Sequence, residues 1–333
     1  MAKVAVMGAG SWGTTMAKVL TDSGNEVTLW ARRADLAEEI NLEHRNGDYL
    51  PGIELPASLK ASSDVEQVLA GAEQVYIAVP SQSLRGSLTE WSEFLPKDAI
   101  LVSLMKGVEK DTGLRMSEVI EAVTGFDIDQ IAVLSGPNLS LEIAAEQPTA
   151  SVVACKSRDN AELVAKAANC AYFTTFTNTD VIGTEFGGIL KNLIAVAIGI
   201  VNGVGYGQNT KASIMTRGLN EMSRFSEAYG GKKKTMKGLA GLGDLIATAE
   251  SPLSRNHKAG EMLGKGYRLN EVIKRLSQTA EGLSSIAPVL ALAEAKGIKM
   301  PIVEQVHAVM QGKMHPREIA PHLTHESDEP QGE

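Results

Sequence analysis

A cluster of glycines near the start of the chain joins an apolar run to a segment with helical spacing. Residues 4–7 are all apolar, Gly8-x-Gly10-x-x-Gly13 follows, and apolar residues resume at helical spacing over 14–23. A strand that enters a helix through this spacing is typical of a dinucleotide-binding turn. The first glycine permits the tight turn, the second admits a pyrophosphate to the backbone, and the third lets the helix pack on the strand. We therefore expect a dinucleotide site here.

Apolar runs alternate with helix-like segments through the first half of the chain. The runs cover residues 3–8, 26–30, 74–79, 99–104, 131–136, 151–155 and 172–176. Such runs, separated by helices, indicate a mostly parallel sheet covered on both faces. Beyond residue 180 the periodicity is helical. We predict an α/β fold with a dinucleotide-binding Rossmann domain at 1–180, an all-helical substrate and catalytic domain at 181–322, and a disordered acidic tail at 323–333.

Composition limits the classes of partner and site. The net charge of −8 over 333 residues gives no electrostatic reason to expect nucleic acid or a lipid surface. The two cysteines, Cys155 and Cys170, have no metal-ligand spacing, which favours a reducing cytoplasm and no metal site. The apolar stretch 193–205 is interrupted by Asn202 and glycines, so we expect a buried helix and no membrane insertion. An apolar helical domain also suggests a homodimer.

The end of the second strand bears on the choice of dinucleotide. An NAD site usually has an acidic residue there to bind the ribose 2′-hydroxyl. Here Arg32 and Arg33 follow the strand, and the first acid, Asp35, comes after them. Guanidinium groups favour a 2′-phosphate, so we expect NADP(H) to be preferred, with NAD(H) possible. The alternative is that both arginines are ordinary surface residues at a helix start.

Residues suited to ligand binding follow two of the later predicted strands. Ligands of open α/β sheets bind beyond the carboxyl ends of the strands. Lys106 follows one strand, and Gly136 and Asn138 follow the next. A lysine in this place is suited to a phosphate or a developing oxyanion, although a surface amine is an equal alternative.

The helical half contains three polar groups in unusual settings. Lys191 and Asn192 lie in an apolar segment, and desolvation of a buried ammonium suits it to proton transfer near neutral pH. Asp244 follows glycines and is placed to face Lys191 or a substrate hydroxyl; capping of the next helix is the alternative, and both roles are compatible. A predicted helix start also holds a polar triplet suited to an anion, with N-capping by its serine as the alternative. The triplet is Ser254, Arg255 and Asn256.

Five blocks, in order, resemble the bacterial NAD(P)-dependent glycerol-3-phosphate dehydrogenase family. They are "GAGSWGTTMA", "SGPN", "GGILKNLIAVAIGIVNGVGYGQNTKASIMTRGL", "GLGDL" and "SRNHKAG". The resemblance spans residues 3 to about 320. It implies interconversion of dihydroxyacetone phosphate and sn-glycerol 3-phosphate by hydride transfer with NAD(P)H, for glycerophospholipid synthesis.

The resemblance also implies residue roles, with Lys191 as the proton donor and acceptor. The implied substrate site comprises Lys106, Gly136, Asn138, Asn192, Asp244, Ser254, Arg255 and Asn256. Besides the glycines, the implied cofactor contacts are Ser11, Trp12, Arg32, Arg33, Lys106, Ser140, Arg255, Thr279 and Glu281. Three of these positions depart from the family pattern: Asn138 replaces a serine, Ser140 an alanine, and Thr279 an apolar residue.

Two other functions fit parts of the sequence. A related NADP-dependent dehydrogenase of a 2-hydroxyacid, opine or ketopantoate-like substrate would need groups for a carboxylate. A non-catalytic NADP(H)-binding regulator would be expected to lack the proton-transfer group, whereas Lys191 is present in an apolar segment.

Overall fold

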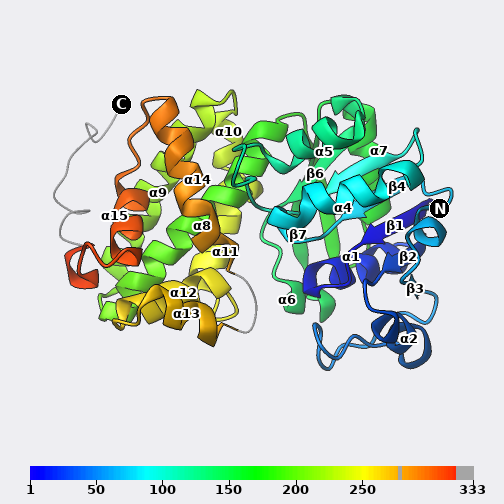
Figure 1. Cartoon of the computed structure of the whole chain (residues 1–333), viewed down its shortest axis with the longest axis horizontal. Helices are drawn as coiled ribbons and strands as arrows, with labels where there is room; N and C mark the ends of the chain where they lie inside the picture. Colours follow the sequence, from blue (N-terminus) through cyan, green and yellow to red (C-terminus); the bar gives the residue numbers. More distant parts are fainter. Residues whose placement is uncertain (277–279, 320–333) are drawn as a thin grey trace. The chain divides into compact units, whose positions relative to one another are not determined.

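The computed structural model describes residues 1–276 and 280–319. The chain forms two compact units, Met1–Glu185 (unit 1) and Phe186–Glu333 (unit 2), and Figure 1 labels most of their helices and strands. Thr279 and the predicted tail at 323–333 lie outside the described residues.

Unit 1 is built on an eight-stranded sheet with the order β3-β2-β1-β4-β5-β6-β7-β8. The strands are β1 (Lys3–Met7), β2 (Glu26–Trp30), β3 (Lys60–Ser62), β4 (Gln74–Ile77), β5 (Ile100–Ser103), β6 (Ile131–Ser135), β7 (Thr149–Cys155) and β8 (Phe173–Asn178). All neighbours are parallel except β6 and β7, so the expected mostly parallel sheet is confirmed. The order from β3 to β6 is that of the Rossmann fold, in which the chain reverses direction across the sheet beside β1.

Both faces of the sheet are covered, as continuous apolar strands require. In β1, Val4 and Val6 enter one core and Ala5 and Met7 the other. The first core includes residues of α1 (Ser11–Asp22), α2 (Ala34–Glu43), α6 (Ser140–Ala144) and α7 (Arg158–Ala168). The second includes residues of α3 (Val65–Leu69), α4 (Leu84–Trp91) and α5 (Met116–Thr124). Short 3-10 turns lie at Ser81–Ser83, Ser92–Phe94 and Ile128–Gln130.

Unit 2 is helical throughout its described part, which confirms the predicted change of pattern. Its helices are α8 (Val181–Val204, which begins in unit 1), α9 (Gln208–Ala228), α10 (Lys233–Met236), α11 (Asp244–Glu250), α12 (Arg255–Gly264), α13 (Leu269–Arg275), α14 (Glu281–Ala295) and α15 (Pro301–Met310). A π-helical turn at Leu239–Gly243 precedes α11, and a 3-10 turn at Pro316–Glu318 follows α15.

The helix α8 is long and apolar enough to cross a membrane, with a mean hydropathy of 1.6 over its most apolar window. However, 83% of that window is buried inside the protein, as in the core helix of a globular fold. The expected buried helix is therefore confirmed, and Asn202 lies within it without ending it.

Glycines let α8 and α12 approach each other closely. A Cβ on Gly199 would lie 2.2 Å from the His257 carbonyl oxygen, and one on Gly260 would lie 2.1 Å from the Val196 carbonyl oxygen. One turn further along, Gly203 and Gly264 are equally restricted by backbone of the opposite helix. Only glycine permits this backbone contact, which determines how the polar residues of the two helices face each other.

Candidate active site

The turn after β1 has the geometry that a dinucleotide requires. Gly8 has a φ of +128°, and a Cβ there would lie 2.5 Å from the Ala78 carbonyl oxygen. A Cβ on Gly13 would lie 1.9 Å from the Gly8 carbonyl oxygen, whereas Gly10 has open space around it. Gly10 is also the N-cap of α1 and offers no side chain to the helix. The first N–H groups of α1 therefore remain available for a pyrophosphate, and the residues fit this part of the cofactor.

A buried asparagine that we did not predict holds this turn. Asn46 is completely buried, and its Nδ2 donates to the Ala9 carbonyl oxygen at 3.0 Å and to Thr14 Oγ1 at 2.8 Å. The backbone N–H of Leu50 donates to the Asn46 carbonyl oxygen at 2.8 Å. Asn46 lies in the segment between α2 and β3, so no local pattern around the glycines could have identified it.

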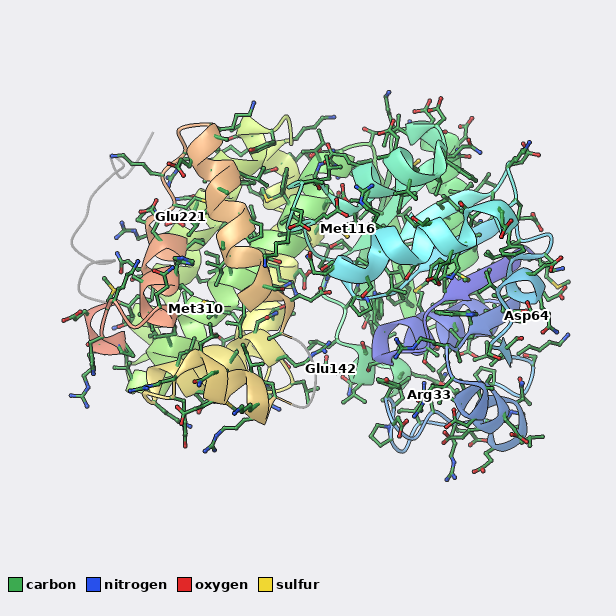
Figure 2. All side chains as sticks on the ribbon, viewed as in Figure 1. Arg33, Asp64, Met116, Glu142, Glu221 and Met310 are labelled. Carbon is green, nitrogen blue, oxygen red and sulfur yellow. The ribbon has the colours of Figure 1, made fainter. Side chains whose placement is uncertain are left out.

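The two arginines after β2 differ in their surroundings. Arg33, labelled in Figure 2, is the N-cap of α2, and its Nη2 donates to Asp48 Oδ2. Its Nε lies 3.8 Å from Asp35 Oδ1. The hydrogen bond to Asp48 and the charge of Asp35 raise the pKa of the Arg33 guanidinium above its ordinary value. Arg32 is exposed and makes no ion pair with the part of the chain that the structure describes.

The structure brings three predicted residues together beyond the carboxyl ends of β5 and β6. Lys106 Nζ donates to the Gly136 carbonyl oxygen at 3.0 Å. Asn138 Nδ2 donates to Ser151 Oγ at 3.1 Å, and that hydroxyl donates to the Ser135 carbonyl oxygen. Asn138 Oδ1 is buried and has no hydrogen-bond partner among the residues that the structure describes. An unsatisfied buried acceptor costs free energy, so it is a natural partner for a hydroxyl group of a ligand.

In unit 2, Lys191 and Asp244 form a buried ion pair. Lys191 Nζ lies 2.9 Å from Asp244 Oδ1, and the two side chains are 8% and 2% exposed. Nζ also donates to Thr248 Oγ1 at 2.5 Å, and that hydroxyl lies 3.2 Å from Asp244 Oδ1. The N-cap of α11 is Gly243, and Asp244 is the first residue of that helix. From this position the Asp244 carboxylate faces Lys191. We did not predict Thr248, although its place four residues after Asp244 puts it on the same helical face.

A second polar chain runs beside this pair. Asn256 Nδ2 donates to Asn192 Oδ1 at 2.8 Å, and Asn256 Oδ1 accepts from the Gly282 backbone N–H at 3.0 Å. Asn192 Nδ2 donates to the Gly188 carbonyl oxygen at 3.2 Å. The glycine contact between α8 and α12 makes this pairing possible, because it brings the backbones of the two helices together.

The other predicted residues lie at element starts. Ser254 is the N-cap of α12, where its Oγ accepts from the His257 N–H at 3.2 Å, and Arg255 is exposed at the first position of that helix. Ser140 begins α6, and its carbonyl oxygen accepts from Thr15 Oγ1 at 3.3 Å. Ser11 and Trp12 begin α1, and Glu281 begins α14.

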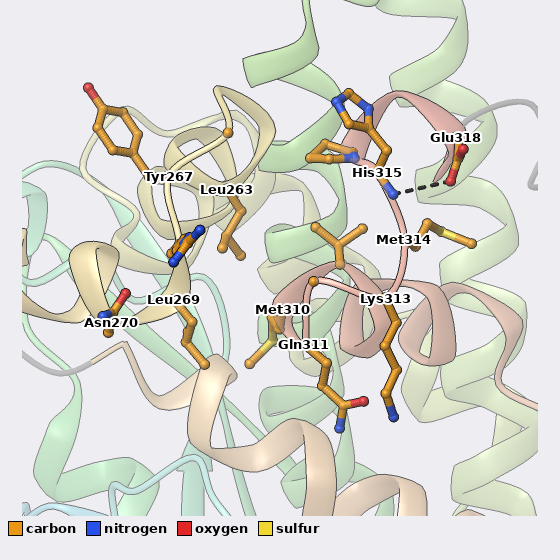
Figure 3. A pocket seen from close by; sticks show the side chains of 15 residues that line it. Leu263, Tyr267, Leu269, Asn270, Met310, Gln311, Lys313, Met314, His315 and Glu318 are labelled. Carbon is orange, nitrogen blue, oxygen red and sulfur yellow. Dashed lines mark hydrogen bonds between the residues drawn. The ribbon is translucent and has the colours of Figure 1, made fainter.

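A surface cavity of about 980 Å³ in unit 2 lies apart from these groups (Figure 3). It lies between the segment from α12 to α13 and the segment that follows α15. None of the predicted site residues lines it. The described residues also include no cluster of three or more His, Cys, Asp or Glu that would hold a metal ion.

Comparisons with known proteins agree over nearly the whole chain. The pattern of the NAD-dependent glycerol-3-phosphate dehydrogenase N-terminus matches residues 3–161, and that of the C-terminus matches residues 180–321. A glycerol-3-phosphate dehydrogenase (NAD(P)+) of Leifsonia xyli is 61% identical over 98% of this chain and 89% of the relative. A relative of the same name, numbered 2, from Mycobacterium tuberculosis is 51% identical over 92% of this chain and 91% of the relative.

Solved structures agree with the fold. A crystal structure of glycerol-3-phosphate dehydrogenase from Coxiella burnetii superposes with a TM-score of 0.91 at 35% identity. The match covers 98% of this chain and 99% of that one. A ketopantoate reductase from Ralstonia eutropha reaches a TM-score of 0.59 at 18% identity, which is a likeness of fold alone.

Proposed function

This chain belongs to the NAD-dependent glycerol-3-phosphate dehydrogenase family and is an NAD(P)-dependent oxidoreductase, and we propose that Lys191 carries the proton of its reaction. The enzyme interconverts dihydroxyacetone phosphate and sn-glycerol 3-phosphate, which supplies the backbone of glycerophospholipids. When bound, the dinucleotide supplies or accepts the hydride. The single observation that carries the proposal is the buried contact of Lys191 with Asp244 and Thr248.

The surroundings of Lys191 support its role in proton transfer. Reduction of a ketone leaves a negative charge on its oxygen, and a proton must reach that oxygen from a positioned donor. Asp244 and Thr248 hold Nζ in one place, which limits the reorganisation needed when the charge develops. The reverse reaction returns the proton from the substrate hydroxyl to Nζ, and the Asp244 carboxylate stabilises the ammonium that forms.

The polar groups near the ends of β5 and β6 suit the substrate oxygens. We propose that Asn138 Oδ1, which has no hydrogen-bond partner in the described part of the chain, accepts a hydrogen bond from a substrate hydroxyl. The ammonium of Lys106, held by the Gly136 carbonyl, stabilises the negative charge that develops on the oxygen of the substrate carbonyl when hydride adds to its carbon. Replacement of the family's serine by Asn138 thus keeps a hydrogen-bonding group at this position.

We assign the substrate phosphate to the start of α12. Arg255 is exposed at the first position of a ten-residue helix, where the helix dipole favours an anion. Asn256 and Asn192 are bonded to each other and lie near the same helix start, and we propose that they contact the substrate hydroxyls. We propose a dinucleotide-binding domain at 1–180, which also contains Lys106 and Asn138, and a substrate and catalytic domain at 181–322.

The proposed dinucleotide site consists of the glycine turn with Ser11, Trp12, Arg32 and Arg33, and we propose a preference for NADP(H) over NAD(H). Support comes from the two guanidiniums after β2 and from the absence of an acidic residue at the end of that strand. One charge-assisted contact to the 2′-phosphate gives about a ten- to hundred-fold preference. The double variant Arg32→Ala with Arg33→Ala should lose most of it through weaker NADPH use. Equal loss of NADH and NADPH use would assign the arginines another role.

We further propose that the enzyme works in the cytoplasm as a homodimer. Both cysteines are free thiols, which suits a reducing compartment. Unit 2 exposes large apolar side chains, including Ile246 and Ile273 at 45% and 58% exposure, which suits association. Light scattering coupled to size-exclusion chromatography would give the mass in solution, and a monomer at micromolar concentration would contradict the dimer.

The variant Lys191→Ala tests the proposed chemistry. We expect kcat for reduction of dihydroxyacetone phosphate to fall about 10²- to 10⁴-fold, the usual contribution of a positioned acid or base. NADPH binding should stay unchanged, because the proposed dinucleotide contacts of the glycine turn lie elsewhere. Lys258→Ala is the matched control, since Lys258 is an exposed lysine on α12. Wild-type turnover in Lys191→Ala would refute the assignment.

A further inference from the structure

We propose that Asp48 is a specificity residue for the dinucleotide and enables one site to accept both a ribose 2′-hydroxyl and a 2′-phosphate. Its carboxylate would accept a hydrogen bond from the hydroxyl of NAD(H), while its partner Arg33 would bind the phosphate of NADP(H). The inference rests on the proposed role of Arg33 in the dinucleotide site.

The first step is the position of the pair. Arg33 is the N-cap of α2, three residues after Trp30, at which β2 ends. Dinucleotides of this fold have their adenine ribose beyond the end of the second strand. Asp48 reaches the same place from the segment between α2 and β3, and its Oδ2 accepts from Arg33 Nη2. Both side chains are about half exposed, at 47% for Arg33 and 57% for Asp48, so a ligand can reach them.

The second step is the way in which Asp48 is held. Two residues earlier in the chain, Asn46 is completely buried and bonded to the Ala9 carbonyl of the glycine turn and to Thr14 of α1. Two residues later, Leu50 is buried as well. The backbone is therefore anchored on both sides of Asp48, and on one side it is held directly by the glycine turn. Asp48 is thus a built part of this end of the site.

The third step is chemical. Sites selective for NAD place a carboxylate at the end of the second strand, and β2 here has none. Asp48 provides a carboxylate near that point from a different segment. The carboxylate suits a hydroxyl donor, but it repels a 2′-phosphate and competes with it for Arg33. Arg33 therefore favours NADP(H). Asp48 favours NAD(H) and disfavours the 2′-phosphate.

Asp35, the other acid near Arg33, is a weaker candidate. Its Oδ1 lies 3.8 Å from Arg33 Nε, beyond hydrogen-bond distance, and its side chain is 75% exposed. Arg32 makes no ion pair with described residues. Of the two arginines, it is therefore Arg33 whose charge is balanced by a neighbouring carboxylate.

The test is the variant Asp48→Asn, with dissociation constants for NADPH and NADH measured by equilibrium titration in the absence of substrate. We expect NADPH to bind about five-fold more tightly and NADH about five-fold more weakly, as for exposed charged contacts. The ratio of kcat/KM for the two dinucleotides should shift in the same direction. Glu54→Gln is the matched control, because Glu54 is an exposed acid in the same segment with no ion pair among the described residues.

A second variant separates the two contacts. In an Arg33→Ala background, Asp48→Asn should still weaken NADH, because the proposed bond to the ribose is direct. The proposal is wrong if Asp48→Asn changes the dissociation constants of NADPH and NADH equally. It is also wrong if Asp48→Asn changes them no more than Glu54→Gln does. Failure of the proposed function is seen separately, as a wild-type enzyme that binds dinucleotides but does not reduce dihydroxyacetone phosphate.

Discussion

Replacing Glu221 with glutamine should remove a pH dependence of stability that is built into unit 2. Glu221 lies on α9, is only 2% exposed, and is labelled in Figure 2. Its Oε1 accepts from the Ile302 N–H at the start of α15 at 2.8 Å, while Oε2 has no hydrogen-bond partner within residues 1–276 and 280–319. Burial raises the pKa of this carboxyl to about 7, opposed by Arg224 and by the backbone of α15 and reinforced by Glu304.

The size and sign of the effect follow from that pKa. The folded protein holds a proton on Glu221 up to about pH 7, whereas the unfolded chain releases it near the ordinary value of 4.5. The folded state therefore binds more protons between these values, and the free energy of unfolding falls as the pH rises through this window. The difference in pKa corresponds to a loss of roughly 3 kcal/mol in the free energy of unfolding. This loss is absent below pH 4.5 and complete above pH 7.

The assay is urea unfolding of wild type and Glu221→Gln followed by far-ultraviolet circular dichroism, because all three tryptophans lie in unit 1. The difference in unfolding free energy between the two proteins should change by about 2.5 kcal/mol from pH 5 to pH 8, in favour of the variant. Glu294→Gln, which alters an exposed carboxylate on α14, should leave the wild-type profile unchanged. Parallel profiles for wild type and Glu221→Gln would refute the reasoning.

Three further variants test other parts of the structure. Glu185→Ala removes the acceptor of Arg115 and of the Ser117 N–H in a buried network, so unit 1 should lose about 3–5 kcal/mol in urea unfolding followed by tryptophan fluorescence. A loss below 1 kcal/mol would show that the network relaxes. Gly13→Ala places a Cβ 1.9 Å from backbone oxygen, so NADPH titration should show lost binding; normal affinity would exclude a closely packed turn. Arg255→Ala should raise the KM for dihydroxyacetone phosphate about ten- to hundred-fold, and an equal rise for unphosphorylated dihydroxyacetone would contradict the phosphate contact.

Local pattern was enough to predict the architecture. Continuous apolar runs between helical segments produce a covered parallel sheet, and the spacing of Gly8, Gly10 and Gly13 determines the turn after β1, since each requirement acts within a few residues. The prediction did not include β3, which has only three residues. Nor did it identify β7 as antiparallel to β6, because a continuous apolar run does not indicate the direction of its strand in the sheet.

The candidate site was only partly within reach of the sequence. A lysine buried in an apolar helix requires a charged or polar partner, and the sequence identified Asp244 as a candidate partner of Lys191. Thr248, Asn46 and Asp48 were not identified, because each acts on a residue distant in the chain. Thr248 bonds Lys191 across 57 positions, and Asn46 bonds Ala9 across 37.

The sequence by itself determined which segments are strands and helices, where the glycine turn lies, and which polar residues are too unusual in their setting to be ordinary. Tertiary structure alone decided which of those residues meet. Asn192 and Asn256 are bonded because four glycines bring α8 and α12 into backbone contact, and Arg33 meets Asp48 because Asn46 anchors a distant segment to the glycine turn. Periodicity records the environment of each residue along its own element, whereas a contact between elements depends on the packing of all the side chains between them.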